Sequence, residues 1–207
     1  IECHIGSQIT ELSPFVDALR RLIKLVDQLA DRGIEIKHLD IGGGRGIVYT
    51  DETLVPMAVF AAAVERELAG RAIQLLLEPG RSIVGDAGLL LTRVEFLKPG
   101  ETKNFAIVDA GMNDLIRPTL YDAYHPVACV VERETEAVEY DVVGPVCESG
   151  DWLAKARKLS LQQGDVIAVL CAGAYGMTMA SNYNTRARPA EVLIDADAMH
   201  LIRDRER

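Results

Sequence analysis

The sequence has few cysteines and no excess of positive charge, and each shortage excludes a class of protein. Its four cysteines, among 207 residues, form no C-x-x-C pair, so neither a metal site nor a dense disulfide scaffold is expected. Lys and Arg number 22 against 31 Asp and Glu, a net charge of −9. That balance lacks the basic surface of a protein that binds nucleic acid or anionic membranes. We therefore expect a small molecule or another protein as the partner.

Long apolar runs are also absent. No run approaches the roughly 20 residues that span a bilayer, and the opening residues, IECHIGSQ, lack the basic and apolar regions of a signal peptide. Cytoplasm is therefore the expected compartment. The composition, 49% apolar and 26% charged, is typical of a globular fold. The chain starts at Ile1, inside a predicted strand and without an initiator Met, which indicates a fragment.

The first part of the sequence predicts strands that alternate with helices. Apolar residues recur every three or four positions over 13–32 and 56–69, which predicts two helices. Short runs over 2–5, 34–41 and 72–77 predict strands, and the lack of polar alternation in the last two indicates a parallel sheet buried on both faces. Polar or glycine-rich residues follow each strand, at the end where (β/α) barrels place their active sites. Three strands cannot close an eight-stranded barrel, so we expect the remaining strands to lie upstream.

The ends of the first helix and the second half of the chain carry turn signals. Ser13 is expected to cap the first helix and Gly33 to end it in a left-handed conformation. Beyond Gly88 the pattern changes to short strands, predicted at 89–97, 105–109, 127–132, 137–143, 166–172 and 191–194. The predicted fold is α/β plus all-β: residues 1–87 are the C-terminal part of a (β/α)8 barrel, and residues 88–207 are a β-sandwich or barrel domain.

Three motifs follow the predicted strands of the first part. The imidazole of His4 can stack on a planar ring, and Ser7 can donate to a phosphate. The glycines at 42–44 expose backbone N–H groups that form an anion-binding nest. Glu78 and Arg81 place an acid and a base at the next strand end. Taken singly, each has an ordinary reading: a packed histidine, a tight turn and a surface salt bridge.

Three more motifs lie in the second part. Arg117 and Tyr121, four residues apart, can together bind a carboxylate. Cys147 stands beside acidic residues in the segment GPVCESGD at 144–151, which is unusual because an exposed thiol is generally a liability. Tyr175 lies between two glycines after an apolar run.

In this order the six motifs resemble those of the fold-type III decarboxylases, which use pyridoxal 5'-phosphate. The motifs are HIGSQ, LDIGGG, EPGR, MNDLIRP with its following tyrosine, GPVCESGD and GAYG, and they extend over essentially the whole chain. The resemblance implies a barrel half that carries the cofactor and a β domain that closes the site across a homodimer interface.

The resemblance also implies how the cofactor is held. His4 would stack on the pyridine face, and the Glu78 carboxylate would keep the pyridine nitrogen protonated. The groups implied for the phosphate and its surrounding turn are Ser7, Gly43, Gly44, Pro79, Gly80, Arg81 and Tyr175.

Substrate binding and proton transfer are implied for a further set of residues. Arg81, Arg117 and Tyr121, with Tyr175 beside them, would bind the distal carboxylate of the substrate, and Glu148 would bind its distal ammonium. Cys147 from the partner subunit would return a proton to the reacting carbon. A substrate with an amino acid at both ends is meso-2,6-diaminopimelate, so the expected reaction yields L-lysine and CO2, the last step of lysine biosynthesis.

The lysine that binds the cofactor covalently in this family lies on an early barrel strand, and no lysine of this sequence matches it. The lysines present are Lys24, Lys37, Lys98, Lys103, Lys155 and Lys158. We therefore expect this chain alone to be inactive.

Other functions stay open at this point. A related decarboxylase would act on arginine, ornithine or carboxynorspermidine. A protein of another class would be a non-catalytic relative that dimerises with an active enzyme, although such relatives are expected to lose the cofactor contacts that are kept here. A third alternative is a fragment refolded into a domain-swapped assembly without native function.

Overall fold

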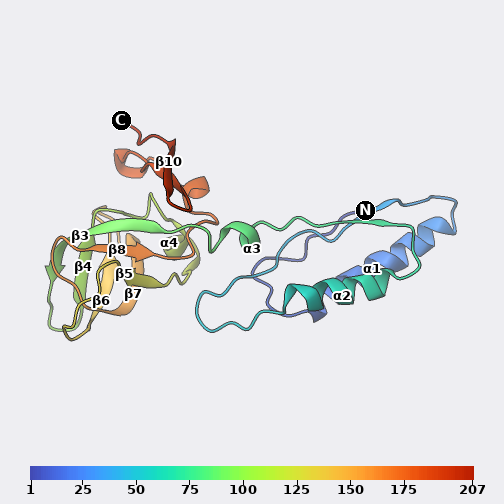
Figure 1. Cartoon of the computed structure of the whole chain (residues 1–207), viewed down its shortest axis with the longest axis horizontal. Helices are drawn as coiled ribbons and strands as arrows, with labels where there is room; N and C mark the ends of the chain where they lie inside the picture. The colour runs from blue at the N-terminus through green and yellow to red at the C-terminus, as the bar shows by residue number, and fades with distance from the viewer. The chain divides into compact units, whose positions relative to one another are not determined.

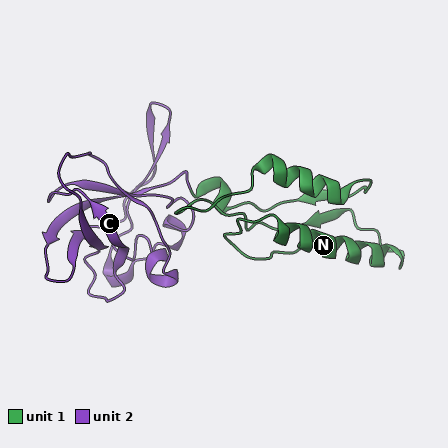
Figure 2. Cartoon of the chain, turned by 90° about the horizontal axis from the view of Figure 1, so that it is seen from below, with its two compact units in different colours: residues 1–85 green, residues 86–207 purple.

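The computed structural model describes all 207 residues, which divide into two compact units, residues 1–85 and 86–207 (Figures 1 and 2). The division falls at 85/86, close to the predicted 87/88. The first unit contains the two long helices and a two-stranded parallel sheet, and the second contains the larger sheet. No helix combines the length and the apolar character that crossing a bilayer requires.

Unit 1 has the predicted alternation of strands and helices. Its elements are α1 (Ser13–Ala30), β1 (His38–Asp40), α2 (Met57–Leu68), β2 (Gln74–Leu76) and the short α3 (Arg81–Val84). Strands β1 and β2 pair in parallel, as predicted, with His38 opposite Gln74. All strands are shorter than predicted, and the expected strand at 2–5 is reduced to a single bridge between Glu2 and Asp40.

The apolar faces of the two helices of unit 1 form its core. Helices α1 and α2 lie side by side (Figure 1), and the ring of Phe15 meets that of Phe60 edge to face at 5.2 Å. Leu19 from α1 and Leu39 from β1 are fully buried in the same cluster. Burial of this stripe against the strands is what makes the helices stable.

The predicted cap of α1 is wrong by one residue and the helix ends at Ala30 rather than at residue 32, whereas the predicted left-handed glycine after it is confirmed. Leu12, not Ser13, is the N-cap residue, and no side chain caps the helix. Leu12 already has helical angles, and its carbonyl accepts the N–H groups of Phe15 and Val16, so Ser13 lies inside the helix. Gly33 has φ +78°, the left-handed conformation expected after a helix.

The larger sheet of unit 2 is curled and mixed, so the barrel alternative is favoured over the sandwich. Its strands are β3 (Leu90–Lys98), β4 (Asn104–Val108), β5 (Val127–Cys129), β6 (Val138–Val143), β7 (Trp152–Leu159) and β8 (Val166–Val169). The order is β5-β8-β3-β4-β6-β7, and only β4 and β6 pair in parallel. The edge strands β5 and β7 lie against each other, which nearly closes the sheet.

Two strands and the short helices of unit 2 were not predicted. Strand β7 has charged residues in its sequence, WLAKARKL, and an irregular register where Ala156 has a positive φ, so it lacks a clean alternation. Strand β10 (Ala198–Arg203) pairs with β9 (Glu191–Asp195) in a separate antiparallel hairpin. The helical segments are α4 (Arg117–Tyr121), η1 (Met177–Met179) and η2 (Tyr183–Thr185).

Strand β7 contributes Leu153 to the core of unit 2, where its side chain is fully buried. We expect Leu153→Ala to lower the free energy of unfolding by roughly 2–5 kcal/mol, because it removes buried apolar surface and leaves a cavity. Denaturant unfolding of the full-length protein measures this loss. Leu120→Ala, at a side chain that is 54% exposed, is the matched control and should change stability little. Equal losses for the two variants would contradict the assigned core.

Candidate active site

The segments that follow the strands of unit 1 approach one another closely at a glycine-rich loop. A Cβ atom on Gly43 would lie 2.1 Å from the carbonyl oxygen of Glu78, and one on Gly42 would lie 2.5 Å from that of Cys3. Gly42 also accepts the N–H of Glu78 at 2.8 Å. Only glycine allows backbones to approach this closely. The loop therefore brings the motifs around His4 and Glu78 into contact with residues 42–44.

The amide groups of this loop differ in their partners. The N–H of Gly42 donates to the Asp40 carboxylate at 2.7 Å, and that of Gly43 points to Nδ1 of His4 at the long distance of 3.4 Å. The N–H of Gly44 donates to no group of the chain. Gly44 has φ +96°, and a Cβ there would lie 2.3 Å from the Gly6 carbonyl, next to Ser7. An open amide beside a hydroxyl is suited to an anion.

Arg81 does not form the surface salt bridge with Glu78 that was one reading of the sequence. Its Nη2 donates to the hydroxyl of Ser7 at 3.0 Å, and its Nη1 donates to the hydroxyl of Tyr49. The guanidinium also lies 5.6 Å from the centre of the Tyr49 ring. Arg81 is thereby fixed beside Ser7. Tyr49 lies in an irregular segment and belongs to no motif, so no sequence pattern indicated this contact.

The side chains of His4 and Glu78 are exposed at this end of unit 1, and Gly80 has open space around it. A cavity of about 60 Å³ lies beneath the glycine loop, with Pro79 at its edge. Phe15 and Phe60 from the two helices line it, so it belongs to the packing between helices and strands. The exposed groups, rather than this cavity, are those able to meet a ligand.

In unit 2, Cys147 lies in an exposed loop, as predicted, and this loop connects β6 to β7. The loop is closed by its own backbone: the N–H of Glu148 donates to the Val146 carbonyl at 2.8 Å, and that of Asp151 to the Glu148 carbonyl at 3.0 Å. An exposed thiol in a structured loop is accessible to a substrate.

Glu148 borders a groove of about 400 Å³ between the Cys147 loop and the sheet. Trp152 and Lys155 form part of the same groove, and the Lys155 ammonium lies 3.3 Å from the centre of the Trp152 ring. The Glu148 carboxylate forms one long contact, 3.4 Å, with the N–H of Gly150. Glu148 is therefore exposed and available to a cationic group.

Arg117 and Tyr121, which were expected to bind a carboxylate together, differ in their exposure to solvent. Arg117 is buried, 7% exposed, and its Nη1 donates to Nε2 of His125 at 2.7 Å. His125 is fully buried and its Nδ1 lies 2.9 Å from the Leu170 carbonyl, so the ring is neutral with its proton on Nδ1. Tyr121, at the other end of α4, is 63% exposed. His125 belongs to none of the six motifs, so no sequence pattern indicated this contact.

Tyr175 belongs to unit 2, whereas Arg81, Ser7 and Gly44, the groups suited to bind a phosphate, belong to unit 1. Its side chain is 43% exposed, and its φ of +61° lies in the left-handed region that non-glycine residues rarely adopt. Backbone strain of this kind is common at functional sites.

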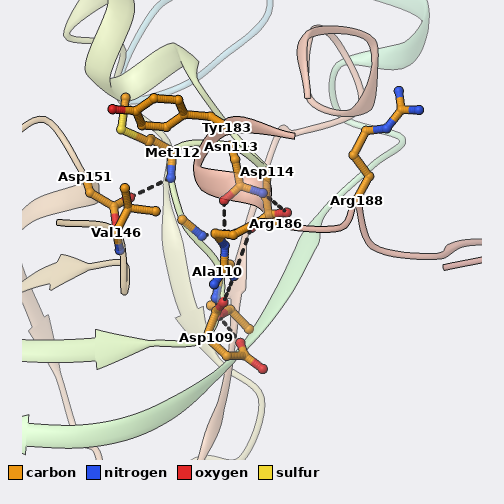
Figure 3. A network of polar contacts seen from close by, with 12 residues as sticks. Asp109, Ala110, Met112, Asn113, Asp114, Val146, Asp151, Tyr183, Arg186 and Arg188 are labelled. Carbon is orange, nitrogen blue, oxygen red and sulfur yellow. Dashed lines mark hydrogen bonds and ion pairs between the residues drawn. The ribbon is translucent and has the colours of Figure 1, made fainter. Parts of the chain in front are cut away.

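A polar network joins the C-terminal segment of unit 2 to the loop that precedes α4 (Figure 3). Nε of Arg186 donates to the Asn113 side chain at 2.9 Å, and its Nη2 donates to the Asp109 carbonyl. Asn113 in turn donates to Asp114 at 2.9 Å. Burial raises the pKa of the Asp114 carboxyl, although the N–H of Gly111 and the nearby Arg186 oppose that shift. The network fixes the residues that lead to Arg117.

Comparison with known proteins assigns the family. The model of the pyridoxal-dependent decarboxylase C-terminal sheet domain matches residues 16–173, which is more than half of the chain. The chain belongs to the pyridoxal-dependent decarboxylases. The resemblance stated from the six motifs is thereby confirmed at the level of the family.

Similar members of the family carry more specific names. The chain is 57% identical to the diaminopimelate decarboxylase of Pseudomonas aeruginosa, over 100% of the chain and 50% of that protein. The solved diaminopimelate decarboxylase of Helicobacter pylori with L-lysine is 40% identical, with a TM-score of 0.94 over 100% of this chain and 51% of that one. The lysine/ornithine decarboxylase of Vibrio vulnificus with cadaverine is 28% identical, with a TM-score of 0.83 over 90% of this chain and 52% of that one. The chain thus spans about half the length of the relatives it matches.

The residues of unit 1 fit the phosphate of this family's cofactor. Arg81 supplies a positive charge, Ser7 a hydroxyl and Gly44 an open amide, all at one end of the unit. These are the donors that bind phosphate in proteins. His4 and Glu78, both exposed and tied to the same glycine loop, are available to the pyridine ring.

Proposed function

We propose that a full-length protein carrying this sequence decarboxylates meso-2,6-diaminopimelate to L-lysine and CO2, with pyridoxal phosphate bound to unit 1. The observation that supports this most directly is the meeting of His4, Ser7, Gly44, Glu78 and Arg81 at the glycine-rich loop. These residue types occur in the same order as in the family motifs. The chain is also more similar to diaminopimelate decarboxylases than to the lysine/ornithine decarboxylase. Arginine, ornithine and carboxynorspermidine are accordingly less favoured substrates.

The residues of unit 1 would bind and tune the cofactor. Arg81, Ser7 and the Gly44 amide would hold the phosphate, and His4 would cover one face of the ring. Glu78 would hold a proton at the pyridine nitrogen, because a carboxylate stabilises the charged form of a neighbouring base. When bound, pyridoxal phosphate accepts the electron pair that the departing CO2 leaves behind.

Unit 2 would supply the groups that act on the substrate. We assign the distal ammonium to Glu148, which is exposed beside the groove, and the distal carboxylate to Arg81, Arg117 and Tyr121, with Tyr175 near the phosphate. The exposed Cys147 thiol would deliver a proton to the reacting carbon. We assign Cys147 and Glu148 to the partner subunit of a homodimer, and the reaction to the cytoplasm, where free cysteines such as these persist.

The substrate assignment is tested by measuring kcat/KM of the full-length protein for four amino acids in parallel. The panel is meso-diaminopimelate, ornithine, arginine and carboxynorspermidine. We expect diaminopimelate to exceed the others by roughly 10⁴-fold or more, because a site built to hydrogen-bond a polar group rejects a substrate that lacks it. A preference for ornithine or arginine would contradict the carboxylate clamp.

Tyr49→Phe tests whether Arg81 is held for the phosphate. The substitution removes the hydroxyl that accepts a hydrogen bond from Nη1 of Arg81. We expect the affinity for pyridoxal phosphate to fall about tenfold, since a hydrogen bond to a charged group contributes about 1.5 kcal/mol or more. Titration of the full-length apo protein measures this loss. Tyr183→Phe, in unit 2, is the control, and a Tyr49→Phe protein with unchanged affinity would argue against this role for Arg81.

A further inference from the structure

Two loops of unit 2 meet at a single buried carboxylate, that of Asp151. One loop, residues 144–150, carries Cys147 and Glu148. The other, residues 109–116, leads to Arg117 in α4. Asp151 is 4% exposed, and none of the roles implied by the motifs falls on it.

Each oxygen of the Asp151 carboxylate accepts a backbone N–H from a different loop. Oδ1 accepts the N–H of Met112 at 2.6 Å, and Oδ2 accepts that of Val146, the residue before Cys147, also at 2.6 Å (Figure 3). The backbone carbonyl of Asp151 accepts a third N–H, from Gly144, at 3.0 Å. Both oxygens of the side chain are therefore occupied by the backbone of the two loops.

Two glycines give this carboxylate its space. A Cβ atom on Gly144 would lie 2.4 Å from Oδ2 of Asp151 and 2.7 Å from the Cα atom of Gly111. A Cβ atom on Gly111 would lie 3.1 Å from Oδ1. Glycine at both positions allows the loops to close around the carboxylate. A further hydrogen bond connects α4 to the Cys147 loop, because the Thr119 hydroxyl donates to the Gly150 carbonyl.

We propose that Asp151 is a positioning residue that fixes the Cys147 loop relative to the segment carrying Arg117. The carboxylate binds no substrate. It holds the Cys147 loop, which the proposed function places in the partner subunit's site, against the segment that carries Arg117 of the chain's own site, by hydrogen bonds to the backbone. This role rests on the proposed function of Cys147, whereas the connection between the loops does not.

Asp151→Asn is the isosteric test, because its Nδ2 donates where one loop amide needs an acceptor. Amide hydrogen exchange at Met112 and Val146 in the full-length protein reports on the connection without any assay of activity. We expect exchange at one or both of these amides to accelerate about tenfold or more. Asp141→Asn is the matched control, because Asp141 likewise accepts a backbone N–H, from Ala156 at 2.8 Å, but its hydrogen bonds go to neither loop. Unchanged exchange in Asp151→Asn would overturn the proposal.

A double-variant cycle separates positioning from general destabilisation. We expect Asp151→Asn to lower kcat for diaminopimelate about tenfold when Cys147 is present, and by less than about twofold in the Cys147→Ala background. Equal losses in both backgrounds would overturn the positioning role. If the unsubstituted protein does not decarboxylate diaminopimelate, the proposed function fails, and the exchange experiment still decides whether Asp151 connects the loops.

Gly144→Ala provides a second variant if Asp151→Asn does not fold. The added methyl group would displace the carboxylate, although residue 151 itself remains an aspartate. The same acceleration of exchange at Val146, and the same dependence of kcat on Cys147, are expected. A Gly144→Ala protein with wild-type exchange and wild-type kcat would count against the proposal.

Discussion

Cys147→Ala in the full-length protein should reduce kcat for diaminopimelate by roughly 10²–10⁴-fold, the range that a positioned general acid contributes. Its affinity for pyridoxal phosphate should stay within about twofold of wild type, because the thiol is assigned to proton transfer alone. Cys147 is exposed in a loop of unit 2, whereas the groups proposed to bind the cofactor phosphate lie in unit 1. Steady-state kinetics and cofactor titration on the same preparation measure both quantities.

The matched control is Cys129→Ala, which removes another free thiol of unit 2. That thiol is partly buried and points to the Ser160 carbonyl at 3.7 Å. We expect kcat to be nearly unchanged. A Cys147→Ala protein that loses kcat and cofactor affinity in the same proportion would rule out the proton-transfer role, because such a pattern reports damage to the whole site.

Glu78→Gln should lower kcat by roughly 10²–10³-fold, an effect comparable to removing one preorganised electrostatic contact. The neutral amide no longer stabilises a proton on the pyridine nitrogen, so the ring accepts the electron pair less readily. The backbone of residue 78 should be undisturbed, because its N–H still donates to Gly42. The absorption spectrum of the bound cofactor, read beside kcat, reports the change in protonation.

Glu65→Gln is the control for loss of a carboxylate in unit 1. Glu65 lies on α2 and is exposed, so its replacement should alter neither the spectrum nor kcat. Nearly intact turnover in Glu78→Gln would show that this carboxylate does not serve the ring nitrogen.

Periodicity predicted most of the framework of unit 1. The stripe containing Phe15, Leu19 and Val26 predicted α1, because its spacing matches one helix face and burial of that face decides the structure. Strand lengths were less predictable. The strands at 34–41 and 72–77 shrank to three paired residues each, because pairing depends on the neighbouring backbone rather than on local apolar content.

Strand β7 shows where sequence patterns fail in unit 2. Its outward residues are charged, and a positive φ at Ala156 shifts the register, so apolar residues do not alternate along it. The contacts with β6 that stabilise it are invisible in its own sequence. The hairpin of β9 and β10 was predicted only in its first half, for the same reason.

The candidate site was predictable where residues act through a motif and unpredictable where they act through a distant partner. The order of His4, Gly43, Glu78 and Arg81 indicated one site, and the strand ends of unit 1 bring these residues together. Tyr49 holds Arg81 from 32 positions away, and no local pattern announces such a hydrogen bond.

The same limit applies to the residues that hold the loops of unit 2. His125 meets Arg117, and Asp151 meets Met112, only after the chain has folded. The burial of Arg117 was likewise unexpected, since a cation next to a proline and a polar turn is typical of a surface.

The most direct test of the whole account is to incubate a full-length protein carrying this sequence with pyridoxal phosphate and meso-diaminopimelate in D2O and to quantify lysine and CO2. The account predicts equimolar lysine and CO2, dependence on the added cofactor, and one deuterium at the carbon that lost CO2, because a thiol such as Cys147 exchanges its proton with solvent. Absence of lysine, or CO2 released without it, would contradict the account.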